Sequence, residues 1–198
     1  MSTTSATKKI LTSDSHPLKV DYVADLPTQG KLGMTFAPGK FQENTPTGNV
    51  WHRDVATDVR VLRETHGTDV LVSLLEDFEY SHMQIEHLFA TCREHGIEVI
   101  HYPIVDGETP VSLEDTHAVV SKMQAHLEAG RNVVVHCKAG LGRTGLITGC
   151  CLKALGVSGE EALERVQLAR NGTCYQTNQQ HYLLHSFLPA VPADRQNA

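Results

Sequence analysis

One stretch of the chain decides its fold, and it reads Asn132-Val133-Val134-Val135-His136-Cys137-Lys138-Ala139-Gly140-Leu141-Gly142-Arg143-Thr144-Gly145. The run of three valines is typical of a short buried strand. Small residues and two glycines follow, and the Arg-Thr pair opens a helical pattern. We therefore expect a strand, a tight loop and a helix, with Cys137 at the point where the strand ends.

The rest of the chain alternates between strand and helix patterns. Apolar runs predict strands at 70–75, 97–104 and 133–135, and apolar residues at helical spacing predict helices at 55–62, 85–92, 112–130, 147–155, 158–169 and 179–188. Ser112 with Asp115, and Ser158 with Glu161, resemble N-terminal capping boxes. This order predicts an α/β fold with a mainly parallel central sheet and helices on both faces. Segments 18–23 and 32–36 are candidates for additional strands.

Length and composition predict one domain in a reducing environment. The 198 residues suit a single core, and we expect a flexible segment at 1–17, one domain at 18–188 and a flexible tail at 189–198. The net charge of −6 argues against nucleic-acid or membrane-surface binding, and no apolar run is long enough to predict a membrane span. The five cysteines form no C-x-x-C pair, and their odd number without a secretory signal predicts a cytoplasmic location. No oligomeric state is predicted.

The loop after Cys137 has the properties of an anion-binding site around a nucleophile. Ligands of such sheets bind beyond the carboxyl ends of the strands, and a helix N-terminus, backbone amides and a cation together favour the reactive thiolate. The amides that would hold phosphoryl oxygens belong to Lys138, Ala139, Gly140, Leu141, Gly142 and Arg143. Arg143 can grip two oxygens, and the Thr144 hydroxyl can ease departure of the cysteine. We expect His136 to orient the loop rather than to act as a base.

Three other interpretations of this loop are weaker. A lone cysteine at a strand end is usually a small buried hydrophobe, but here it is accompanied by Arg143 and Thr144 at suitable spacing. Glycines 140, 142 and 145 match a dinucleotide-binding pattern, which requires a following strand that ends in an acidic residue; a second capped helix follows instead. A Walker phosphate loop requires Lys-Ser or Lys-Thr after its last glycine, and the sequence has neither there.

A phosphate-cleaving cysteine also needs a general acid and a positioned water. Asp106 follows a predicted strand, in a short loop that can close over a substrate, and is our candidate acid. Its alternatives are a simple turn role beside Gly107 and the rival acid Glu108. Gln176 and Gln180 lie in a glutamine-rich turn, and an amide that donates and accepts can hold an attacking water.

These residues resemble the cysteine-dependent dual-specificity protein phosphatases, in particular the branch of the cell-division-cycle and kinase-associated phosphatases. The resemblance covers residues 30–188 and rests on His136-Cys137 with Arg143-Thr144, on the acid loop at 103–110 and on the tail at 175–187. It implies a protein tyrosine phosphatase-like fold. It also implies a phosphoenzyme route in which Cys137 attacks phosphorus and Asp106 protonates the leaving alcohol, with no metal or other cofactor.

The resemblance leaves the substrate and the partner to be decided. It implies a phosphorylated protein, with a kinase as one candidate partner, while Lys138 would also favour a second anionic group such as that of a phosphoinositide. An RNA 5′-triphosphatase and a non-catalytic phospho-binding scaffold are further alternatives. Some relatives protect the nucleophile with a second cysteine, for which Cys174 is the candidate here. His181 and His185 share a helix face but lack a third metal ligand.

Overall fold

The computed structural model describes residues 9–43, 45, 48–170, 172 and 174–189. Its central sheet has the strand order β2-β3-β8-β6-β7. The five strands are β2 (Asp21–Tyr22), β3 (Leu32–Phe36), β8 (Val133–Cys137), β6 (Val70–Ser73) and β7 (Glu98–His101). Only the β2–β3 pair is antiparallel among them. The mainly parallel sheet predicted from the sequence is therefore confirmed.

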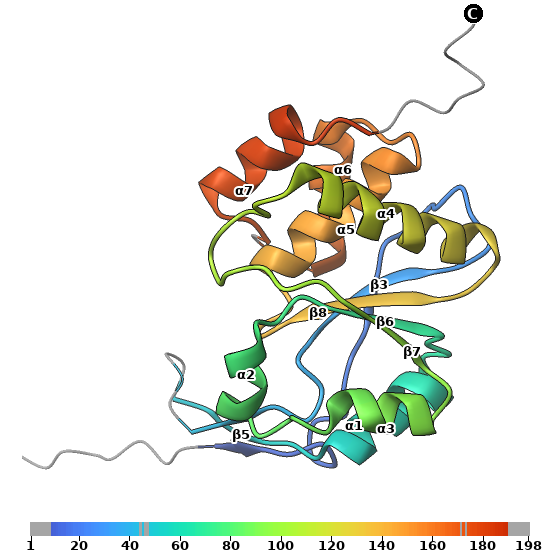
Figure 1. Cartoon of the computed structure of the whole chain (residues 1–198). Helices are drawn as coiled ribbons and strands as arrows, with labels where there is room; N and C mark the ends of the chain where they lie inside the picture. The colour runs from blue at the N-terminus through green and yellow to red at the C-terminus, as the bar shows by residue number, and fades with distance from the viewer. Residues whose placement is uncertain (1–8, 44, 46–47, 171, 173, 190–198) are drawn as a thin grey trace, which may run out of the picture.

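Helices cover both faces of this sheet (Figure 1). One face carries α4 (Leu113–Glu128), α5 (Gly142–Ala154), α6 (Gly159–Arg170), α7 (Thr177–His181) and the π-helical turn η2 (Tyr182–Ser186). The other face carries α1 (Val55–Arg60), the π-helical turn η1 (Val61–Thr65), α2 (Asp77–His82) and α3 (Leu88–Glu94). Strand side chains alternate between the two faces, so Val133 and Val135 join one core cluster and Val134 joins the other.

Several predicted boundaries are right and others shift for identifiable reasons. Ser112 Oγ accepts from the Asp115 amide at 3.1 Å, and Ser158 Oγ accepts from the Glu161 amide at 3.2 Å, as the capping patterns predicted. The strand predicted at 97–104 ends at His101, ahead of Pro103, which has no N–H for a ladder. The last helix begins at residue 177 instead of 179 and continues into η2.

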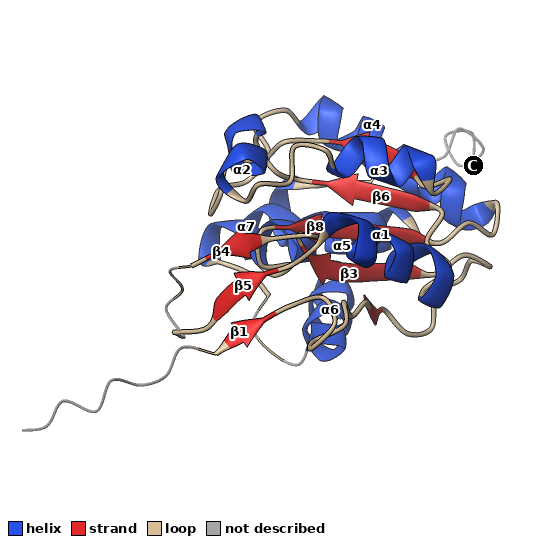
Figure 2. Cartoon of the chain, turned by 90° about the horizontal axis from the view of Figure 1, so that it is seen from below, coloured by secondary structure: helices blue, strands red, loops and turns tan. Residues whose placement is uncertain are grey.

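A second, small sheet was not predicted (Figure 2). It has the order β1-β5-β4, formed by β1 (Ile10–Leu11), β5 (Val50–His52) and β4 (Phe41–Gln42). Strands this short show no readable periodicity. β1 lies inside the segment 1–17 that we expected to be flexible, and Arg53 ties the following turn down through the carbonyl oxygen of His16 at 2.7 Å. Residues 1–8 and 190–198 of the predicted flexible ends lie outside the described residues.

Candidate active site

The loop that follows β8 has a conformation that only glycine allows at its centre. Cys137 ends β8 opposite Phe36 of β3, and this residue is only 3% exposed. Gly140 has a φ of 70°, and a Cβ atom there would lie 2.3 Å from the carbonyl oxygen of Thr35. The loop therefore packs its backbone directly against β3 while turning into α5.

The amide groups of this loop are available to an anion. Within the described part of the chain, the N–H groups of residues 139–144 donate to no backbone carbonyl, and Leu141, which precedes α5, provides no side-chain cap. Unpaired N–H groups at a helix N-terminus, combined with the helix dipole, attract negatively charged oxygens. These N–H groups follow Cys137 directly in the chain and can donate to a bound anion.

Arg143 is held in place by a glutamate that the sequence analysis did not identify. Glu79 of α2 receives hydrogen bonds from both terminal nitrogens of Arg143, at 2.5 and 2.9 Å. One of these two nitrogens, Nη1, also donates to the carbonyl oxygen of Ile104 at 3.0 Å. Glu79 also accepts from the backbone N–H of Glu76 at 2.9 Å and so caps its own helix. The guanidinium is thereby held in place by α2 and by the segment that follows β7.

Electrostatics keep this pair ionised. Burial alone would raise the pKa of Glu79, but the hydrogen bonds from Arg143 and from the Glu76 amide, together with the Arg143 charge, lower it below its usual value. Burial opposes the charge of Arg143, yet its pKa is raised because Glu79, Cys137 and Asp106 favour the cation. Arg143 Nε is buried and has no hydrogen-bond partner among the described residues. That unused donor points to a ligand with acceptor oxygens.

The acid loop reaches the same guanidinium. Asp106 Oδ1 lies 3.0 Å from a terminal nitrogen of Arg143, and its side chain is 67% exposed. The rival acid Glu108 is exposed, and its contribution to this region is a backbone carbonyl. The structure therefore places the side chain of Asp106, rather than that of Glu108, against Arg143.

A buried glutamine connects the acid loop to α7. Gln179 Nε2 donates to the carbonyl oxygen of Glu108 at 3.1 Å, while its Oε1 accepts from the Gln176 amide at 3.1 Å. Gln176 is exposed, with its side chain against Gly107, and Gln180 is half-buried. The sequence analysis had singled out residues 176 and 180, but the fully buried member of the group is Gln179.

The two remaining loop residues are buried in different ways. His136 is fully buried, and burial followed by the charge of Arg143 lowers its pKa to about 4. A neutral ring with Nδ1 3.4 Å from the Cys137 carbonyl oxygen fits an orienting residue. The Thr144 hydroxyl is buried without a hydrogen-bond partner in the described part of the chain, and its predicted role toward the sulfur stays a prediction.

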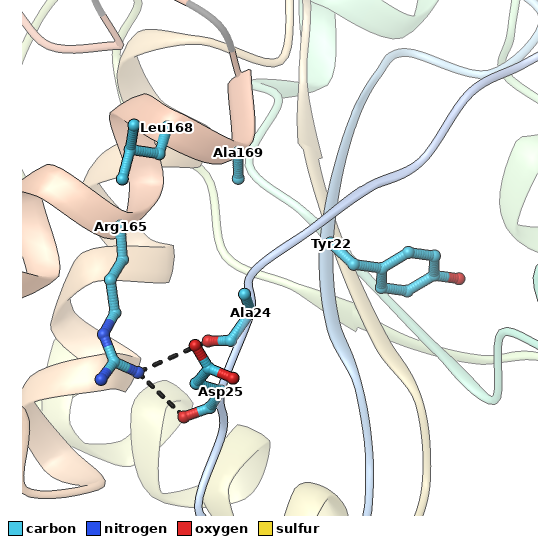
Figure 3. Close-up of a pocket in the computed structure, with 6 residues that line it drawn as sticks. All are labelled: Tyr22, Ala24, Asp25, Arg165, Leu168 and Ala169. Carbon is cyan, nitrogen blue, oxygen red and sulfur yellow. Dashed lines mark hydrogen bonds between the residues drawn. The ribbon is translucent and has the colours of Figure 1, made fainter.

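The structure also places the remaining candidate features. All five cysteines are free, and Cys174 packs against Gly145 of α5. The described residues hold no group of three potential metal ligands, and none of their helices is long and apolar enough to cross a membrane. Arg165 lines a pocket between β2 and α6 and donates to the carbonyl oxygens of Ala24 and Asp25 (Figure 3).

Comparison with known proteins identifies the family. A family model described as "Polymorphic toxin system, DSP-PTPase phosphatase" matches residues 47–156. The chain belongs to this phosphatase family. Cyclin-dependent kinase inhibitor 3 of Homo sapiens is 29% identical over 165 residues, which cover 82% of this chain and 74% of that protein. The dual specificity protein phosphatase CDC14AB of Danio rerio is 38% identical over 88 residues, or 42% of this chain and 13% of that protein.

Solved structures agree on the fold. A structure of kinase associated phosphatase with its catalytic-site cysteine changed to serine has a TM-score of 0.76 at 24% identity and covers 86% of this chain and 94% of that chain. Tk-PTP in its active form has a TM-score of 0.62 at 24% identity, with 85% and 95% covered. The protein is a cysteine-dependent dual-specificity phosphatase with a protein tyrosine phosphatase-like fold, and both predictions are confirmed.

Proposed function

We propose that Cys137 is the nucleophile of this phosphatase and that Arg143 binds the phosphoryl group. The observation that carries the proposal is the buried Nε of Arg143, unpartnered among the described residues, beside a loop of unpaired amides that follows Cys137. The donors that would hold three phosphoryl oxygens are the amides of Lys138, Ala139, Gly140, Leu141, Gly142 and Arg143. Such preorganised donors stabilise the charge that develops in the transition state.

The proposed reaction has two steps. The Cys137 sulfur attacks phosphorus, the bond to the substrate oxygen breaks, and Asp106 gives that oxygen its proton. A water held by Gln176 then loses a proton to Asp106 and attacks the cysteinyl phosphate, which releases phosphate and the Cys137 thiolate beside Thr144. Binding of a phosphoryl group competes with Asp106 for Arg143, which frees the Asp106 side chain to reach the leaving oxygen.

The proposed substrate is a phosphorylated protein, and a phosphorylated kinase is one candidate because several relatives are named cyclin-dependent kinase inhibitor 3. We assign the phosphatase domain to residues 18–188. The five free cysteines suit a reducing, cytoplasmic compartment, in which the thiol of Cys137 stays available.

Hydrolysis of p-nitrophenyl phosphate with a reductant and without added metal tests the assignment. We expect turnover by the wild type and none by Cys137→Ser, which should still bind vanadate. Cys92→Ala is the matched control: this buried thiol lies on α3, burial raises its pKa to about 12, and its removal should leave turnover in place. If Cys137→Ser still turned over this substrate, Cys137 would not be the nucleophile.

A further inference from the structure

The turn between β3 and β4 is fixed in one conformation beside the catalytic loop. Within this turn Gly39 has a φ of 74°, and a Cβ atom there would lie 2.1 Å from the side chain of Val55 on α1. The Gly39 N–H donates to the buried carboxylate of Asp58 at 2.8 Å. The turn also donates the Ala37 N–H to the carbonyl oxygen of Lys138, in the catalytic loop, at 3.4 Å. The residue that follows Gly39 is therefore held close to that loop.

This next residue, Lys40, is a buried cation without a carboxylate partner in the described part of the chain. It is only 5% exposed, and its Nζ lies 4.6 Å from the centre of the Trp51 ring and 5.5 Å from that of Phe36. Its one hydrogen-bond acceptor among the described residues is the Lys138 carbonyl oxygen at 3.5 Å, although an ammonium has three donors. Burying an unpaired charge is costly, so an ammonium in this place indicates an anion nearby.

The charges around Lys40 leave one candidate for that anion. The ionisable groups that act on Lys40 in the described structure are Lys138, Cys137 and Arg53, and Arg53 is already paired with Asp58 at 2.7 Å. Burial, and then the charge of Lys138, lower the pKa of Lys40 to about 8, whereas a negative charge on Cys137 favours the ammonium form. Because the attraction between two charges is mutual, the ammonium favours the thiolate of Cys137 in the same way.

The contact with Lys138 also orients the catalytic loop. Two donors, the Ala37 N–H and the Lys40 ammonium, lie on the same carbonyl oxygen of Lys138. In a trans peptide group the N–H and the C=O point in opposite directions, so the N–H of Ala139 points away from the turn between β3 and β4. That amide is one of the donors proposed for the phosphoryl oxygens. Lys40 thus contributes orientation as well as charge.

From this geometry we propose that Lys40 is a positioning residue: it holds the Lys138 carbonyl oxygen in place, and its ammonium is the counter-ion of the Cys137 thiolate. The inference rests on the proposed function, in which Cys137 is the nucleophile. Before the attack, the ammonium favours the deprotonated sulfur. Lys40 exchanges no proton with the substrate and forms no bond to phosphorus, so its contribution is electrostatic throughout the reaction.

Alkylation of Cys137 by iodoacetamide, measured by mass spectrometry between about pH 4 and pH 9, tests the inference without relying on turnover. In Lys40→Met, the pH of half-maximal alkylation rate should rise by roughly one unit, and kcat/KM for p-nitrophenyl phosphate below that pH should fall about tenfold. Lys40→Arg keeps the charge and should keep the wild-type midpoint. Lys153→Met is the matched control, because Lys153 is also buried but donates to the carbonyl oxygens of Leu183 and Phe187.

The outcomes separate this inference from the proposed function. An unchanged midpoint in Lys40→Met would overturn it, and so would an equal rise in Lys153→Met, because the shift would then follow from the loss of any buried lysine. A rise in Lys40→Arg as large as in Lys40→Met would also overturn it. If wild-type Cys137 instead reacted like a free thiol, with a midpoint near about pH 8.5, and p-nitrophenyl phosphate were not hydrolysed, the proposed function itself would be refuted. Circular dichroism melting checks each variant, and Lys40→Gln replaces Lys40→Met if the latter does not fold.

Discussion

Replacing Glu79 by glutamine should damage both stability and catalysis, although Glu79 is remote from Cys137 in the sequence. Glu79 is 5% exposed and holds both terminal nitrogens of Arg143. Breaking one partner of a buried ion pair typically costs about 3–5 kcal/mol. In the variant, Arg143 still donates to the carbonyl oxygens of Leu74 and Ile104, and the glutamine side chain still offers it one acceptor oxygen. We therefore expect a loss of stability at the lower end of this range, about 3 kcal/mol. For a chain of this size the melting temperature should fall by about 6–12 °C.

Urea unfolding and steady-state kinetics on the same preparations give both readouts. We expect kcat/KM for p-nitrophenyl phosphate to fall by about 10²-fold, because a guanidinium displaced by about 1 Å no longer fits the phosphoryl oxygens. Asp77→Asn makes the same charge change at an exposed position of α2 and serves as the control. If Glu79→Gln unfolds and turns over like Asp77→Asn, then Glu79 does not anchor Arg143 and the reasoning is wrong.

Two further measurements separate the charge pair from general damage to α2. The double variant Glu79→Gln/Arg143→Met removes both buried charges and should recover stability without recovering turnover. The pKa of Glu79 is lower in the folded protein than its unfolded value of about 4.3, so its contribution to stability is present above that pH and is lost as the pH falls through the folded pKa. The difference in free energy of unfolding between wild type and Glu79→Gln should therefore have its full size at pH 7 and should decrease below about pH 4.

Three more variants test the acid loop and the catalytic loop. Asp106→Asn should lower kcat about 10²-fold or more for phosphoserine peptides and much less for p-nitrophenyl phosphate, whose leaving group needs no proton. If Glu108→Gln shows this dependence on the leaving group and Asp106→Asn does not, then Glu108 is the acid. Gln179→Met removes the hydrogen bond to the acid loop, so kcat should fall about tenfold for phosphoserine peptides and much less for p-nitrophenyl phosphate. An equal loss of kcat for both substrates would indicate a purely structural role. Gly140→Ala places a Cβ atom 2.3 Å from the Thr35 carbonyl oxygen, so we expect the free energy of unfolding in urea to fall by more than about 2 kcal/mol. Vanadate should then no longer inhibit the enzyme, and unchanged inhibition would contradict the loop geometry.

The sequence was sufficient where structure is local. The segment that contains Cys137 and Arg143 is one strand, one loop and one helix, so the spacing of its residues determines their relative positions. The position of Asp106 beside Arg143 was also predictable, because the carboxyl ends of parallel strands meet at one edge of the sheet, while its role as the acid stays a prediction.

Glu79 and Gln179 could not be found in the same way. Glu79 lies 64 residues before Arg143, on a helix of six residues that is too short for a periodic apolar stripe. Its one local signal is the pair Glu76 and Glu79, which forms a capping box in the structure with glutamate in the position where serine or threonine is usual. The sequence does not distinguish Gln179 from Gln176 and Gln180, because only the turn of α7 decides which of the three side chains is buried.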